Sequence, residues 1–123
     1  MRRVFRTRYF ARRMRKSGVG DAALLAAVDE MARGLIDADL GGGVVKKRVA
    51  LPGRGKRGST RTIVATNKGS RWFFVYGYEK NEQANISVAE LEALQALAVD
   101  LLRMTVAELN RAVECGELQE ITP

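Results

Sequence analysis

The sequence predicts a single α+β domain, with helices before and after a central group of β-strands. Apolar residues recur at helical spacing in the first third of the chain, whereas residues 44–78 alternate and are rich in β-branched types. The last third carries two helix-start signals in succession. A chain of 123 residues with 46% apolar composition is typical of one domain with a buried core, so we treat residues 1–123 as one unit.

Two helices are expected in the N-terminal third, after a short first strand. Residues 4–6 fit an edge strand, and residues 8–16 form a weakly amphipathic helix that ends at the glycines that follow. Asp21 stands at an expected N-cap position, where a short polar side chain accepts from the free amides of the first turn. The next helix carries one apolar stripe that we expect to face the core: Leu24, Val28, Met31 and Leu35. The three glycines at residues 41–43 predict a flexible break.

Three strands are expected after this break. In the first, residues 44–50, alternation places Lys46 and Arg48 on the same face. The second covers residues 60–66 and the third residues 71–78, and the four residues between them have the length of a hairpin turn. Because the third strand is apolar on both faces, we expect it to be central in its sheet. Strict alternation turns Phe73 and Val75 to one face and the other aromatic side chains to the opposite face: Trp72, Phe74, Tyr76 and Tyr78.

The C-terminal third is expected to be helical. Ser87 and Glu90 form a capping box, in which the serine oxygen accepts from the third amide of the helix while the glutamate reaches back. Thr105 and Glu108 repeat this signal, so residues 104–123 contain an additional C-terminal helix, which ends near Gly116.

Positive charge is concentrated in two segments without any acidic residue. Residues 1–16 contain eight arginines and lysines, and residues 46–61 contain seven, whereas the chain after residue 85 has seven acids against two arginines. Residues 1–85 therefore carry 19 basic and 7 acidic groups, a net charge of +12. Like charges at this density repel one another unless a polyanion or an acidic partner neutralises them. This pattern favours binding of RNA or another polyanion over a merely solvated basic surface.

The composition excludes several classes of function. With one cysteine and no histidine, the chain cannot form an internal disulfide, a zinc site with the usual ligands, or a Ser-His-Asp or Cys-His system. We expect no metal and no cofactor, and we interpret Cys115 as an incidental small residue. No uninterrupted apolar stretch is long enough for a membrane helix, and no apolar region follows the basic N-terminus as in a secretory signal. These features predict a cytoplasmic protein that does not act at a membrane.

A glycine-rich basic loop connects the first two expected strands of the central group. Residues 53–58 match the G-x-G-x-x-G pattern, but a strand follows them, whereas a dinucleotide-binding site needs a helix there. The glycines allow close approach of the backbone, and three side chains can contact RNA phosphates: Arg54, Lys56 and Arg57.

Four segments, taken in order, resemble a known family. They are the block Gly41–Ala50, the loop Pro52–Gly58, the strand start at Thr60 and Arg61, and the segment Phe74–Glu82. Their order, with two leading helices and a trailing one, is similar to that of the RelE/ParE toxin superfamily and, within it, the HigB-like branch. The resemblance covers about residues 3–103, most of the chain.

This resemblance implies a fold and an activity. The fold has two N-terminal helices packed on one face of an antiparallel sheet of about four strands, a concave basic face left open, and C-terminal helices. The activity is that of a type II toxin: metal-independent cleavage of mRNA, usually in the ribosomal A site, by attack of a 2′-hydroxyl on the next phosphate. The implied partners are mRNA, the ribosome and a cognate antitoxin, which we expect to carry a helix-turn-helix domain.

The resemblance also assigns site residues. The family's basic pair on the first strand of the central group falls on Lys46 and Arg48, and its arginine at the start of the next strand falls on Arg61. Basic residues after the last strand correspond to Lys80 and Asn81, of which the second departs from the arginine of many relatives. The chain also lacks the family's RNA-stacking tyrosine, for which Tyr76 or Tyr78 is the available substitute.

Chemistry leaves the individual roles open. Arg48 and Arg61 can stabilise a pentavalent phosphate, and Lys46, crowded by other cations, is a possible base. Lys80 is the nearest candidate acid and Glu82 a rival base. Two other functions fit the same charge pattern: a non-catalytic RNA-binding or ribosome-binding module, and a ParE-like inhibitor of DNA gyrase.

Overall fold

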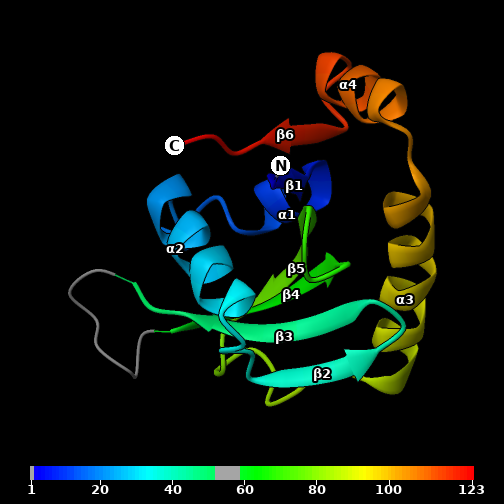
Figure 1. The fold of residues 1–123 in the computed structure, drawn as a ribbon. Coiled ribbons are helices and arrows are strands. Elements are labelled where there is room, and N and C mark those ends of the chain that lie inside the picture. Colours follow the sequence, from blue (N-terminus) through cyan, green and yellow to red (C-terminus); the bar gives the residue numbers. More distant parts are fainter. Residues whose placement is uncertain (1, 52–58) are drawn as a thin grey trace.

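The computed structural model describes residues 2–51 and 59–123. Over these residues, it is an α+β domain built on one six-stranded sheet, with strand order β2-β3-β4-β5-β1-β6 (Figure 1). The strands are β1 (Arg3–Thr7), β2 (Ala38–Gly41), β3 (Val44–Val49), β4 (Thr60–Thr66), β5 (Arg71–Tyr78) and β6 (Leu118–Glu120). The helices are α1 (Arg8–Arg13), α2 (Asp21–Ala32), α3 (Val88–Arg103) and α4 (Val106–Glu114). No helix in this part of the chain is long and apolar enough to cross a membrane.

The helices begin at or next to the residues that the sequence indicated, and α2 differs from the prediction at both of its ends. Both capping boxes are present, at Ser87 with Glu90 for α3 and at Thr105 with Glu108 for α4. Helix α2 buries most of its predicted stripe, but it ends at Ala32, so Leu35 lies beyond it and is 56% exposed. The N-cap of α2 is Gly20, and Asp21 is the first helical residue, which corrects the predicted N-cap.

The sheet confirms the predicted class but is larger and partly parallel. Strand β1 pairs in parallel with β5 and antiparallel with β6, so the expectation that residues 4–6 form an edge strand was wrong. Strands β2 and β6 form the two edges instead. They have four and three residues, which is too short for alternation to identify them in the sequence.

The three glycines at residues 41–43 form a tight hairpin turn, not a flexible break. All three have positive φ, a region that residues with a side chain rarely adopt, and they reverse the chain between β2 and β3. The turn is pressed against α3, because a Cβ atom on Gly42 would lie 2.9 Å from Cγ of Gln95. This contact anchors the β2–β3 hairpin to the helix across one face of the sheet.

A β-bulge in β5 changes which face its tyrosines occupy. Ile63 pairs with Tyr76 while the next residue of β4, Val64, pairs with Phe74, so Val75 is an extra residue in β5. Beyond the bulge, Tyr76 and Tyr78 lie with Phe73 in the core cluster under α3, and not with Phe74. Strict alternation therefore predicted the wrong face for the two tyrosines.

The bulge places the tyrosines on the face that α3 covers in part. One face of the sheet packs against α1 and α2 through a cluster that includes Phe10, Leu24 and Trp72. The opposite face, which carries the tyrosines, packs against α3 and α4 through a cluster that includes Phe73, Ala98 and Leu109. Helix α3 runs along one side of the sheet (Figure 1), so the face that we expected to be open is open only beyond this helix.

Candidate functional site

Three neighbouring strands bring the predicted basic residues together. Arg48 of β3 is paired in register with Arg61 of β4, and Arg61 is paired with Tyr78 of β5. These residues form one row across the sheet, and Lys46 lies two residues from Arg48 on the same face of β3. A rigid sheet therefore fixes the spacing of the cationic groups.

A pocket of about 270 Å³ lies over this row of residues. It is lined by Asp37, Lys46, Arg48, Arg61, Tyr78, Ala84 and Asn85. The predicted grouping of Lys46, Arg48 and Arg61 next to a tyrosine is confirmed. The three cations of the predicted loop, Arg54, Lys56 and Arg57, lie outside the described residues.

Asp37 brings a carboxylate into this basic pocket, and no sequence motif indicated this residue. Its Oδ2 accepts the backbone N–H of Arg48 at 2.6 Å, and its Oδ1 lies 3.5 Å from Nε of the same residue. The backbone N–H of Asp37 donates to the carbonyl oxygen of Lys46 at 3.0 Å. Asp37 thus holds both the backbone and the guanidinium of Arg48, and the two residues lie eleven positions apart, beyond any local sequence signal.

The hydroxyl group of Tyr78 is buried without a hydrogen-bond partner among the described residues. The side chain has 0% exposure, yet the residue lines the pocket beside Arg61. Burial raises the pKa of the phenol above its ordinary value, and the positive charge of Arg61 opposes this shift. The group is therefore neutral at physiological pH and is a hydrogen-bond donor without a partner among the described residues.

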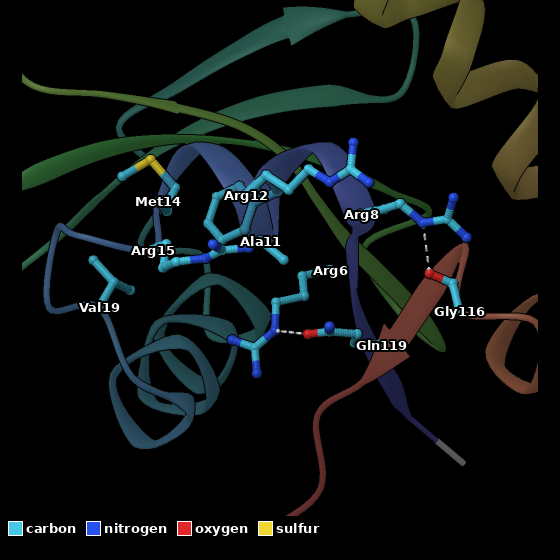
Figure 2. A pocket seen from close by; sticks show the side chains of 10 residues that line it. Arg6, Arg8, Ala11, Arg12, Met14, Arg15, Val19, Gly116 and Gln119 are labelled. Atoms are coloured by element: carbon cyan, nitrogen blue, oxygen red, sulfur yellow. Dashed lines mark hydrogen bonds between the residues drawn. The ribbon is translucent and has the colours of Figure 1, made fainter.

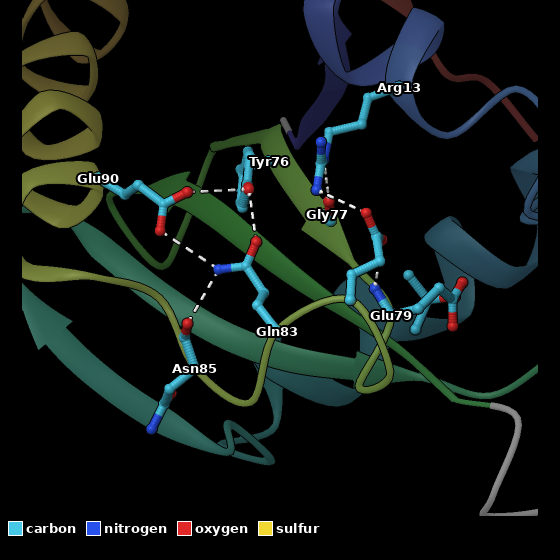
Figure 3. Close-up of polar contacts among 9 residues, drawn as sticks. Arg13, Tyr76, Gly77, Glu79, Gln83, Asn85 and Glu90 are labelled. Atoms are coloured by element: carbon cyan, nitrogen blue, oxygen red, sulfur yellow. Dashed lines mark hydrogen bonds and ion pairs between the residues drawn. The ribbon is translucent and has the colours of Figure 1, made fainter.

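Tyr76, in contrast, is held in a network of polar contacts (Figure 3). Its hydroxyl lies 2.9 Å from Oε1 of Gln83 and 3.0 Å from Oε2 of Glu90, and the guanidinium of Arg13 covers its ring at 4.6 Å. Burial, and then the hydrogen bond to Glu90, raise the pKa of Tyr76 to about 12. Its ring is 8% exposed, so neither predicted tyrosine offers a free face on which an RNA base could stack. The exposed aromatic side chain nearby is Tyr9, which stacks on Tyr76 and is 56% exposed.

The same network fixes the segment after β5. The side-chain amide of Gln83 donates to the backbone oxygen of Asn85 at 2.9 Å, and Asn85 lines the pocket. Lys80 and Asn81 lie in the turn immediately after β5, are exposed, and do not line the pocket. Glu82 does not line it either, because its carboxylate lies 3.2 Å from Nη2 of Arg13. The structure thus brings Asn85 to the cations instead of the two residues that the resemblance had indicated.

Lys47, the neighbour of Lys46 in β3, stabilises the fold and does not line the pocket. It lies on the opposite face of β3 from Lys46 and is 8% exposed. Its ammonium group contacts Oε1 of Glu30 at 2.8 Å and the carbonyl oxygen of Leu35 at 2.9 Å. Lys46 forms no such contact with any described residue, and its charge is therefore available to a ligand.

The N-terminal basic segment is partly neutralised within the molecule and does not join this pocket. Four of its arginines form ion pairs: Arg2 with Asp29, Arg3 with Glu120, Arg6 with Asp21 and Arg13 with Glu82. The Arg3 pair is bidentate, at 2.8 and 2.9 Å, and this hydrogen bond holds the pKa of Glu120 below its usual value. Within residues 2–51 and 59–123, no group of three or more histidine, cysteine, aspartate or glutamate side chains could hold a metal ion.

Comparison with known proteins identifies the family. The family model described as the RelE toxin of the RelE / RelB toxin-antitoxin system matches residues 2–121. No curated protein matches the sequence at a significant level. The chain therefore belongs to the RelE toxin family, whose members pair with an antitoxin and typically inhibit translation. The match concerns the family as a whole and does not distinguish the HigB-like branch.

Proposed function

We propose that the protein is an endoribonuclease that cleaves mRNA on the ribosome, with its active site in the pocket of Lys46, Arg48, Arg61 and Tyr78. Family membership supports the class of target, since toxins of this family are usually endoribonucleases. The observation that carries the assignment of the site is the buried hydroxyl of Tyr78, which has no partner among the described residues, in a residue that lines one pocket with Lys46, Arg48 and Arg61.

The proposed reaction is transesterification within the RNA chain. The 2′-hydroxyl of one nucleotide loses its proton to a base and attacks the adjacent phosphorus, and the bond from phosphorus to the 5′-oxygen breaks. The leaving oxygen takes up a proton, which gives a 2′,3′-cyclic phosphate and a 5′-hydroxyl. This reaction requires neutralisation of the extra negative charge on the phosphate and a proton donor near the leaving oxygen.

Arg48 and Arg61 have the geometry for the first requirement. Paired residues on neighbouring strands place their side chains on the same face of the sheet, so both guanidinium groups can contact the non-bridging oxygens of one phosphate. The Asp37 carboxylate orients Arg48 for this contact. Lys46, which is half-buried and lines the same pocket as these cations, is the candidate base.

Tyr78 is the candidate proton donor in place of Lys80. The residue lines the pocket and its raised pKa keeps the hydroxyl protonated, whereas Lys80 is exposed in a turn that does not line the pocket. Asn85 can add a neutral hydrogen bond to the sugar or the phosphate. The ribosome would supply alignment of the RNA, which a pocket of this size cannot impose on a long polymer.

A translating extract tests the proposed function. Wild-type protein should produce mRNA fragments that end in a 2′,3′-cyclic phosphate, and Arg61→Ala should not. Lys47→Met, on the opposite face of the same sheet, is the matched control and should still cleave if it folds, as judged by circular dichroism. Translation that stops while the mRNA stays intact would indicate a non-catalytic ribosome-binding module. Loss of supercoiling by gyrase without any RNA cleavage would indicate the ParE-like alternative.

A further inference from the structure

An arginine-rich pocket lies apart from the proposed active site, against helix α1 (Figure 2). Its volume is about 440 Å³, and none of its residues lines the pocket of Lys46 and Arg61. The lining contains four arginines together with apolar side chains and the turn between α4 and β6: Arg6, Arg8, Phe10, Ala11, Arg12, Met14, Arg15, Val19, Gly116 and Gln119.

The four arginines divide into two that are fixed and two that are free to bind. Arg6 donates through Nε to Gln119 at 2.9 Å and forms an ion pair with Asp21, so this arginine of the pocket already binds one carboxylate. Arg8 donates to the carbonyl oxygens of Gly116 and Cys115 at 3.1 and 3.2 Å, where α4 ends. Arg12 and Arg15 are exposed and form no ion pair with any described residue.

An apolar pocket shares one lining residue, Arg8, with the arginine-rich pocket. Its volume is about 370 Å³, and it lies between the start of α1, helix α3 and helix α4. Three leucine side chains of α3 form much of its wall, Leu94, Leu97 and Leu101, together with Met104 just beyond the end of the helix. Tyr9 also lines this pocket and is 56% exposed. Glu117 is the acidic residue in this lining.

We propose that the two pockets together form the docking site for an acidic, apolar segment of a partner protein. Carboxylates of the partner would bind Arg12 and Arg15, and an aliphatic or aromatic side chain of the same segment would enter the leucine-lined pocket. The combination favours a protein over RNA. Phosphates could satisfy the arginines, but RNA bases bind by stacking on flat aromatic or guanidinium surfaces, and apart from Tyr9 and Arg8 the wall of the leucine-lined pocket is mostly aliphatic.

The partner that we assign to this site is the antitoxin, and the segment of it that docks here is expected to be acidic. This inference rests on the pairing of family members with an antitoxin, and it does not depend on RNA cleavage. None of the residues that line these two pockets lines the proposed active site. The antitoxin would then act by adding bulk beside α1, and not by filling the site of catalysis.

Calorimetry with the full-length toxin and its cognate antitoxin tests this site. The variant Arg12→Glu/Arg15→Glu should bind the antitoxin at least about tenfold more weakly at physiological salt, because attraction between opposite charges is replaced by repulsion between like charges. The control Arg33→Glu/Arg103→Glu makes the same change in net charge at exposed positions outside both pockets and should bind within about twofold of wild type. Leu97→Ser should weaken binding as well, with a smaller dependence on salt.

Three results would overturn the docking site. They are undiminished binding by Arg12→Glu/Arg15→Glu, equal weakening by the control pair, and loss of ribosome binding by Arg12→Glu/Arg15→Glu while antitoxin affinity stays unchanged. The last result would mean that the arginines bind RNA. If wild-type protein binds the antitoxin through these arginines but never cleaves RNA, the docking site stands and the proposed function fails.

Discussion

Two arginine-rich regions of this small domain have similar charge and very different surroundings. In the proposed active site, Arg48 and Arg61 stand on paired strands next to a buried hydroxyl group that lacks a partner. In the pocket beside α1, Arg12 and Arg15 stand on and just after a six-residue helix with apolar residues beneath them. The first region has fixed spacing and an unused hydrogen-bond donor, as chemistry at one phosphate requires. The second has exposed side chains next to an apolar pocket, as recognition of a protein surface requires.

The largest expected effect is on the rate of mRNA cleavage, which should depend on the first region and not on the second. Arg61→Ala should lower the single-turnover rate of mRNA cleavage by about 10²–10³-fold, because one fixed donor to the developing phosphate charge is lost. Arg61→Lys should recover only part of this rate, since an ammonium group cannot contact two oxygens in the same plane. Arg12→Ala/Arg15→Ala, measured in the same assay, should cleave at the wild-type rate. An equal loss in this pair would break the distinction between the regions.

The sequence predicted the first region well for a specific reason. Lys46, Arg48 and Arg61 lie in strands whose alternation is uninterrupted, so residue parity was enough to place them on one face. The face of the sheet that Tyr76 and Tyr78 occupy was predicted wrongly, because the bulge at Val75 depends on pairing with β4 and leaves no signal within β5 itself.

Other parts of the site depend on contacts between distant segments. Asp37 reaches Arg48 through the pairing of β2 and β3, and β2 is too short to predict. Asn85 enters the pocket because Gln83 and Glu90 bend the chain after β5, whereas resemblance pointed to Lys80 and Asn81 in the preceding turn. Family patterns align residues along a chain, but the direction of a side chain in a turn depends on local hydrogen bonds.

Tyr78→Phe sharpens the assignment within the active site. Removal of the hydroxyl should lower the cleavage rate by about 10–100-fold with little change in KM, because the donor acts on the leaving oxygen. The variant should be as stable as wild type or more stable by up to about 1 kcal/mol, since the group has no partner to lose. Urea unfolding followed by the fluorescence of the single tryptophan, Trp72, gives the stability. A variant that loses stability but keeps its cleavage rate would contradict the proposed role.

Tyr76→Phe is the matched control and should behave in the opposite way. Its hydroxyl is bonded to Glu90 and Gln83, so its removal should cost about 1–2 kcal/mol of unfolding free energy and change the rate of cleavage little.

The pKa of Tyr76, raised to about 12, gives this control a pH signature. The raised value means that the stabilising contribution of the phenol is complete below the ordinary pKa near 10 and is lost as pH rises from there towards 12. Stability of the wild type should therefore fall in that range more steeply than stability of Tyr76→Phe. Parallel pH curves for the two proteins would show that the network of Figure 3 does not hold the phenol in its neutral form.

The smallest expected effect concerns the salt dependence of RNA binding. A short single strand with 2′-O-methyl groups cannot be cleaved, so its affinity can be measured directly by fluorescence anisotropy. Each phosphate neutralised on a single strand contributes about −0.7 to the slope of log affinity against log salt. Arg48→Ala/Arg61→Ala should reduce the magnitude of the slope by about 0.7, because both arginines contact one phosphate, and removal of Arg54, Lys56 and Arg57 should reduce it by up to about 2. Arg12→Ala/Arg15→Ala should leave the slope unchanged, because we assign these arginines to a protein partner. A reduced slope in this last variant would place the path of the RNA across both regions, and the difference in their surroundings would then reflect two parts of one RNA-binding surface.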